Sequence, residues 1–136
     1  MRRWVVGSVV LVMFVLGVAL GASGQLEKSQ EALERAAKDY LKSGLLLAGE
    51  GRDEEAAKSF RQALALKSQW AEAHSLLGSA LARTGNYREA EEELRKAVAL
   101  KPDYAEGWNY LGIFLKERGK EQEAQEAFRK AKQYQH

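Results

Sequence analysis

The pattern of apolar and small residues along the chain repeats every 34 positions after residue 36. The clearest sets of equivalent positions are Ala37, Ala71 and Ala105; Gly44, Gly78 and Gly112; Leu47, Leu81 and Leu115; and Phe60, Leu94 and Phe128. Self-similarity at this spacing is typical of helical repeat arrays, in which each unit buries its apolar face against its neighbours. The sequence therefore predicts a stack of three similar units.

Each unit has the pattern of two amphipathic helices, with apolar residues recurring at spacings of three, four and seven. The predicted first helices cover residues 37–50, 71–84 and 105–118, and the predicted second helices cover 53–66, 87–100 and 121–134. A glycine that can adopt the left-handed conformation separates the two helices of each unit, at Gly51, Gly85 and Gly119. Pro102 lies between the second and third units, where a helix must stop.

A further glycine lies inside each first helix, where it costs about 1 kcal/mol relative to alanine. We expect a close contact between the two helices of a unit to compensate for this cost. In the second unit the small Ala90 would lie opposite Gly78, and Leu94 would fill the wider space further along. The equivalent residues of the other two units would follow the same arrangement.

The units resemble the tetratricopeptide repeat, whose motif places an aromatic residue, Leu-Gly, Tyr, Gly, Tyr, Ala, Phe, Ala and Pro at fixed positions over 34 residues. The third unit carries Trp108, Leu111-Gly112, Gly119, Ala124, Phe128 and Ala131, and the second carries Leu77-Gly78, Gly85, Tyr87, Ala90, Ala97 and Pro102. The first unit departs from the motif, since Ser43 replaces the leucine and Ser68 the proline. The resemblance implies an all-α fold, a right-handed α-solenoid of three helix-turn-helix units preceded by an N-terminal hydrophobic helix.

The N-terminal segment has a different character. Residues 4–22 contain no charged side chain, and a helix of this length would span roughly 28 Å, close to the hydrocarbon thickness of a bilayer. Two interpretations stay open: a retained transmembrane anchor, which the length favours, and a signal peptide cut before Gln25 or after Gly21. Arg2 and Arg3 precede the segment, so the tail is expected in the cytoplasm and the repeats outside it, in a bacterium the periplasm or cell surface.

These patterns divide the chain into five parts. Residues 1–24 form the anchor or signal peptide, 25–36 a connecting helix, and 37–70, 71–104 and 105–136 the three repeats. The connecting helix is expected to begin near Leu26 and to run into the first repeat. Two alternatives stay open for its start: it continues the apolar helix nearly without a break, or Ser23-Gly24 forms a hinge between them.

Composition and motifs argue against chemistry. The net charge of +2 comes entirely from Arg2 and Arg3, so a basic stripe for nucleic acid is not expected. Cysteine is absent, and His74 occupies the aromatic position of its repeat, where a structural role is expected. His136 is terminal, and no phosphate loop, nucleophile motif or metal-ligand spacing occurs. We predict a non-enzymatic protein without cofactor or metal.

In the tetratricopeptide family, first helices line a concave face that binds peptides or partner helices. By analogy, the expected groove is an apolar strip with a mixed-charge rim, made of Leu41, Leu45, Leu76, Asn109, Tyr110 and Ile113. One subfamily clamps a terminal carboxylate with lysine, arginine and asparagine at these places, and this chain has leucine, glutamate and tyrosine at most of them. The resemblance therefore does not imply such a clamp here. An alternative is that some of these residues, Leu45 and Leu76 above all, simply pack in the core.

The expected function is therefore that of an adaptor or scaffold at the membrane, which binds a peptide or helix of a partner protein in the groove. The alternative is a structural subunit packed permanently within a larger membrane or envelope complex. A homodimer is less favoured.

Overall fold

The computed structural model describes residues 17–136 with their side chains, and residues 2–16 only as part of the first helix. Residues 2–136 contain helices and turns but no strand. Six helices follow one another: α1 (Arg2–Gly49), α2 (Asp53–Leu66), α3 (Ala71–Thr84), α4 (Tyr87–Leu100), α5 (Ala105–Glu117) and α6 (Glu121–Gln133). The bounds of α2 to α6 differ by at most one residue from those predicted from the apolar periodicity. The fold is therefore all-helical, as expected.

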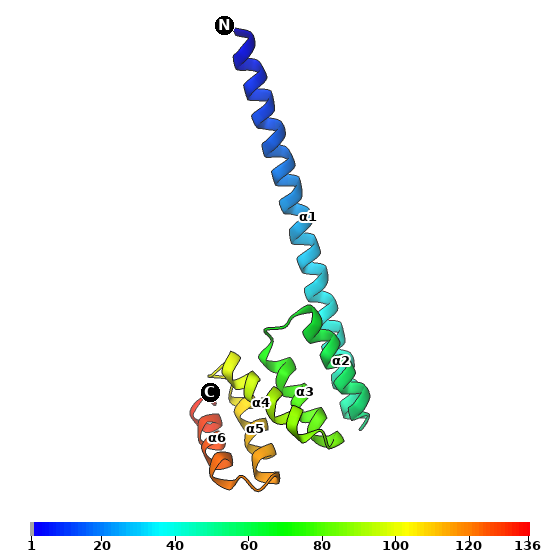
Figure 1. Ribbon diagram of the computed structural model, residues 1–136, viewed down its shortest axis with the longest axis vertical. Helices are drawn as coiled ribbons and strands as arrows, with labels where there is room; N and C mark the ends of the chain where they lie inside the picture. Colours follow the sequence, from blue (N-terminus) through cyan, green and yellow to red (C-terminus); the bar gives the residue numbers. More distant parts are fainter. Residues whose placement is uncertain (1) are drawn as a thin grey trace. The chain divides into compact units, whose positions relative to one another are not determined.

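The chain divides into two compact units, residues 1–35 and 36–136, and all three repeats lie in the second (Figure 1). Of the two alternatives for Ser23-Gly24, the structure has the continuous helix: α1 runs through both residues, and the Ser23 hydroxyl donates to the carbonyl of Ala19 at 2.9 Å. Within the described residues no helix has a stretch long and apolar enough to cross a membrane. Most of the predicted anchor, residues 4–16, lies outside the described residues.

The turn between the two helices of each repeat has the predicted conformation. Gly51, Gly85 and Gly119 have φ values of 76°, 88° and 77°, in the left-handed region that a side chain disfavours. In each turn the backbone N–H that follows the glycine bonds back to a leucine carbonyl five residues earlier, as Asn86 does to Leu81 at 2.9 Å. These bonds satisfy helix-end carbonyls and fix where α1, α3 and α5 stop.

The glycines inside the first helices face a larger side chain than the one predicted. A Cβ atom built on Gly78 would lie 2.6 Å from Cγ of Leu94 and 3.0 Å from the backbone oxygen of Ala90. On Gly44 and Gly112 it would lie 2.5 and 2.7 Å from the rings of Phe60 and Phe128. The glycines thus make room for the large side chain of the second helix, which lies directly over them and not further along as expected. The expected close approach of Ala90 to Gly78 is present as well, through the alanine backbone.

A single core of apolar side chains runs through the repeats. Its largest fully buried members are Phe60, Leu81, Leu94 and Leu115, which come from second and first helices in alternation. Each repeat therefore contributes side chains to a core that it shares with its neighbours, as expected for stacked units.

Ion pairs on the surface repeat with the same period. Arg61 of α2 bonds Glu89 of α4, and Arg95 of α4 bonds Glu123 of α6, both at 2.6 Å and both across 28 residues. Arg61 and Arg95 are equivalent positions, as are Glu89 and Glu123. The second helices of successive repeats are therefore tied by one recurring contact, which adds charge complementarity to the apolar stacking.

Candidate functional site

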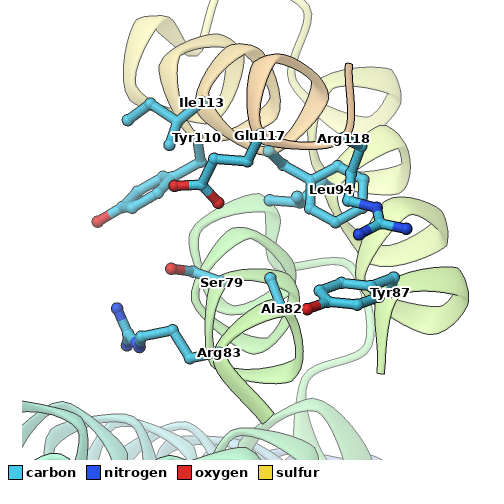
Figure 2. A pocket seen from close by; sticks show the side chains of 10 residues that line it. Ser79, Ala82, Arg83, Tyr87, Leu94, Tyr110, Ile113, Glu117 and Arg118 are labelled. Atoms are coloured by element: carbon cyan, nitrogen blue, oxygen red, sulfur yellow. The ribbon is translucent and has the colours of Figure 1, made fainter. Parts of the chain in front are cut away.

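A pocket of about 360 Å³ opens between α3, α5 and the beginning of α4 (Figure 2). Its lining combines apolar and aromatic side chains with three charged groups: Ser79, Ala82, Arg83, Tyr87, Leu94, Tyr110, Ile113, Phe114, Glu117 and Arg118. Leu94 and Phe114 belong to the core, whereas Tyr87 and Ile113 are 43% and 44% exposed. The pocket therefore has a buried apolar floor and accessible apolar walls, which suits an anchoring side chain of another molecule.

Five residues of the pocket lining, Ser79, Arg83, Tyr110, Ile113 and Glu117, belong to two stripes that run along the first helices of the second and third repeats. On α5 the stripe consists of Glu106, Tyr110, Ile113 and Glu117, and on α3 of Glu72, Leu76, Ser79 and Arg83. Both follow the spacing of four, three and four residues that keeps side chains on one helix face. We call the space between these stripes, which includes the pocket, the α3–α5 groove.

The cations at the pocket are held by neighbouring groups. The guanidinium of Arg118 lies 3.9 Å from the ring centre of Tyr87, a cation–π contact that orders both side chains at the pocket edge. Nε of Arg83 lies 2.7 Å from a carboxylate oxygen of Asp53 on α2. Glu117, by contrast, has no hydrogen-bond or ion-pair partner among residues 17–136. The Tyr87–Arg118 edge of the pocket is thus ordered before any ligand binds, and the Glu117 carboxylate remains available to pair with one.

The end of the groove formed by the first turns of α3 and α5 is acidic, since Glu72 and Glu106 stand there. Tyr104 lies over Gly107, and its hydroxyl donates to Oε2 of Glu106 at 3.3 Å. Burial raises the pKa of the Tyr104 hydroxyl, and the nearby carboxylates of Glu106 and Glu72 raise it further. Tyr110, which lines the pocket, adds a smaller contribution to the raised pKa of the Tyr104 hydroxyl.

Only two of the six predicted groove residues line the pocket. Tyr110 and Ile113 do, and Tyr110 also packs against the core. Leu41 is only 7% exposed and belongs to the core, so the prediction that it forms part of an exposed strip was wrong. Leu76 is half-buried and packs against the core, as the alternative expected, whereas Leu45 is 43% exposed.

Asn109, the remaining predicted residue, is exposed on α5 but is not part of the pocket lining. The sequence prediction missed Tyr87, Arg118 and Glu117. Glu117 continues the Tyr110–Ile113 stripe by four residues, so helical spacing alone would have found it. Tyr87 was taken as a repeat-motif position, and its contact with Arg118 depends on how two repeats stack.

His74 and Trp108 occupy the aromatic position of their repeats, and both have a structural role there. Nε1 of Trp108 donates to the carbonyl of Pro102 at 2.8 Å, and Nε2 of His74 contacts the equivalent carbonyl, that of Ser68, at the same distance. His74 is 4% exposed, and its Nδ1 lies 2.5 Å from Oε2 of Glu93. The histidine therefore substitutes for the tryptophan in a structural hydrogen bond. Within the described residues no group of three or more His, Cys, Asp or Glu side chains is placed to hold a metal ion.

These features define the chain as an α-helical repeat protein with a groove between first helices. Three family models match it, two described as Tetratricopeptide repeat over residues 71–104 and 93–126 and one as TPR repeat over residues 44–85. Together these matches span residues 44–126, and the chain belongs to the tetratricopeptide repeat family. No curated protein sequence matches it.

Several solved structures have a similar fold. The second TPR of Spaghetti (RPAP3), bound to the HSP90 peptide SRMEEVD, has a TM-score of 0.72 at 21% identity, covering 79% of this chain and 99% of that chain. MamA has a TM-score of 0.66 at 23% identity, covering 79% and 67%. Pseudomonas aeruginosa pilF is 30% identical with a TM-score of 0.71, covering 75% of this chain but 46% of that chain.

Proposed function

We propose that this protein is a non-enzymatic adaptor that binds a peptide segment of a partner protein in the α3–α5 groove. The observation that carries the proposal is the pocket between α3 and α5, where Tyr87 and Ile113 are exposed beside a core-lined floor. Exposed apolar walls around a preformed hollow are what an anchoring side chain requires. The fold supports the same function, because the similar RPAP3 domain was solved with a bound peptide.

The groove residues differ from those that would hold a terminal carboxylate. Tyr110 and Glu106 stand on α5, and Leu76 stands on α3, at positions where the resemblance would place cationic or amide side chains in the clamping subfamily. The proposed partner segment is therefore held by an apolar anchor, and no recognition of a free C-terminus is proposed.

We further propose that the adaptor acts at a membrane, anchored through residues 4–22 with its repeats on the extracytoplasmic side. The support is the uncharged apolar sequence of this segment and the two arginines before it. A reporter fused to the C-terminus that works on one side only of the membrane tests the orientation. N-terminal sequencing of the mature chain distinguishes this anchor from a signal peptide removed after export.

The binding proposal is tested by site-specific photo-crosslinking of the full chain in the membranes of cells that produce it. A photoreactive side chain at residue 113 should capture a partner protein, and the same group at residue 54, exposed on α2, should not. Ile113→Ser should abolish capture by a photoreactive group at residue 110 without changing the melting temperature, because the side chain is 44% exposed. Equal capture from residues 54 and 113 would contradict the proposal.

The second candidate is a structural subunit packed permanently within a larger complex. It is favoured by the exposed Leu45 and Leu46 on α1, which are 43% and 63% accessible and lie outside the pocket. Leu46→Ser separates the two functions. As an adaptor, the protein should keep its partner after this substitution, whereas as a packed subunit it should lose assembly.

A further inference from the structure

Three carboxylates of the α3–α5 groove have no ion-pair partner among residues 17–136: two stand at its first end, and Glu117 lies at the pocket. Glu72 stands on α3 and Glu106 on α5 at this first end, and the next residues of the two stripes are Leu76 and Tyr110. Tyr110 and Ile113 line the pocket, whereas Leu76 packs against the core. Glu72 has no hydrogen-bond or ion-pair partner among residues 17–136, and Glu106 accepts only the long hydrogen bond from Tyr104. Two carboxylates with little local neutralisation therefore face the same end of the groove.

Among residues 17–136 no cation forms an ion pair with these two carboxylates, and the cation of Lys101 lies over the ring of Tyr104, 5.6 Å from its centre. Arg83 is the cation of the α3 stripe, but it stands eleven residues beyond Glu72, about 16 Å along the helix, and is paired with Asp53. Arg118 is stacked on Tyr87 at the same far end. The uncompensated charge at the first end of the groove is therefore negative, and the complementary charge must come from the ligand.

From this arrangement we infer that the bound segment is an extended peptide carrying a lysine or arginine about three residues from an aliphatic or aromatic anchor. The inference rests on the proposed function and specifies its ligand. Seven residues separate Glu106 from Ile113 on α5, a distance of about 10 Å along a helix. An extended peptide covers this distance in about three residues. The basic residue lies between Glu72 and Glu106, and the anchor enters the pocket at Tyr110 and Ile113.

The first experiment selects peptides from a phage-displayed library of random nonamers on the purified full chain in detergent micelles. Selected peptides should carry a Lys or Arg that is two to four residues away from an aliphatic or aromatic residue. Selection of acidic peptides, or of apolar peptides without a basic residue, would overturn the inference. A spacing near seven would show a helical ligand and would also overturn it.

The second experiment measures the affinity of one selected peptide, made synthetically, for the double variant Glu72→Gln, Glu106→Gln. Each exposed charge pair contributes modestly, so we expect binding to weaken about three- to tenfold and to lose most of its salt dependence. The matched control is Glu54→Gln, which also removes a glutamate from the first turn of a helix, but on α2 outside the groove. Unchanged affinity in the double variant would contradict the inference.

The two proposals fail in different ways. If peptides bind through Ile113 but show no preference for basic residues, the groove is functional and only the ligand chemistry is wrong. If Ile113→Ser leaves peptide binding intact, or no peptide is selected at all, the proposed function itself fails. The melting temperature of each variant is measured in parallel, because first-turn glutamates also stabilise their helices.

Discussion

Nδ1 of His74 lies 2.5 Å from Oε2 of Glu93, a contact between α3 and α4 in which one side chain is 5% and the other 19% exposed. The other ring nitrogen contacts the carbonyl of Ser68 at 2.8 Å, so both nitrogens face oxygen acceptors. In the third repeat Trp108 stands at the position of His74 and donates to the equivalent carbonyl, and Ala127 stands at the position of Glu93. The histidine and glutamate are therefore a coupled pair of departures from the repeat motif.

The first prediction follows from this coupling. His74→Phe leaves the Ser68 carbonyl and the Glu93 carboxylate without their donor, and unsatisfied buried groups cost about 1–3 kcal/mol. His74→Trp with Glu93→Ala recreates the pair found in the third repeat and should be at least 1 kcal/mol more stable than His74→Phe. Chemical denaturation of the three proteins measures the difference. Equal stability of His74→Phe and the wild type would show that the pair contributes nothing.

A second prediction concerns pH. The hydrogen bond from His74 holds the pKa of the Glu93 carboxyl below its ordinary value of 4.5, although burial acts in the opposite direction. Because the folded-state pKa is the lower one, the stabilisation is complete above about pH 4.5 and is lost as the pH falls through the folded-state value. The difference in unfolding free energy between the wild type and Glu93→Gln should therefore shrink as the pH falls below 4.5. Denaturation at several pH values measures it, and a difference independent of pH would contradict this account.

The third prediction concerns the glycine–leucine contact of the second repeat. Gly78→Ala gains about 1 kcal/mol of helix propensity but forces Leu94 to move, and overpacking costs about 1–3 kcal/mol. We expect a net destabilisation that is smaller when Leu94→Ala has already removed the opposing side chain. Gly49→Ala is the control, because a Cβ atom there meets nothing within 4 Å. Thermal unfolding of the single and double variants measures the coupling, and strictly additive effects would disprove the contact.

A fourth prediction concerns the recurring surface ion pairs. Arg95→Ala removes the contacts with Glu91 and Glu123 and should cost at most about 1 kcal/mol, because exposed pairs contribute little. The loss should become smaller in 1 M salt, where such charges are screened. Arg88→Ala, whose side chain is 95% exposed and pairs only within its helix, should cost less. A loss from Arg95→Ala that is insensitive to salt would assign the effect to packing instead of charge.

Much of the fold follows from local patterns. The spacing of apolar residues determines the helices, and Gly51, Gly85 and Gly119 determine the turns, because only glycine adopts the left-handed conformation at little cost. The family follows from the same positions, since a repeated motif appears in the sequence several times. These features depend on neighbouring residues alone, and for that reason the sequence predicted them closely.

Side-chain partners between helices were predicted less well. Gly78 was expected to face Ala90 with Leu94 further along, but the approach of α3 to α4 places Leu94 directly over it. Leu41 and Leu45 lie on the same helix with similar apolar character, yet one is 7% and the other 43% exposed. The difference depends on the rotation of the helix within the stack. The apolar periodicity identifies which side of a helix faces the core, but not which residues of that side its neighbours cover.

By itself, the sequence determined the number of helix pairs, the limits of α2 to α6 to within one residue, and the glycine turns. Only the tertiary structure decided which apolar residues remain accessible, and that Tyr87 and Arg118 form one edge of the pocket with Tyr110 and Ile113. The physical reason is that helices and turns arise from interactions within a few residues along the chain. A pocket between α3, α4 and α5 exists only after two repeats have stacked at a particular angle and depth.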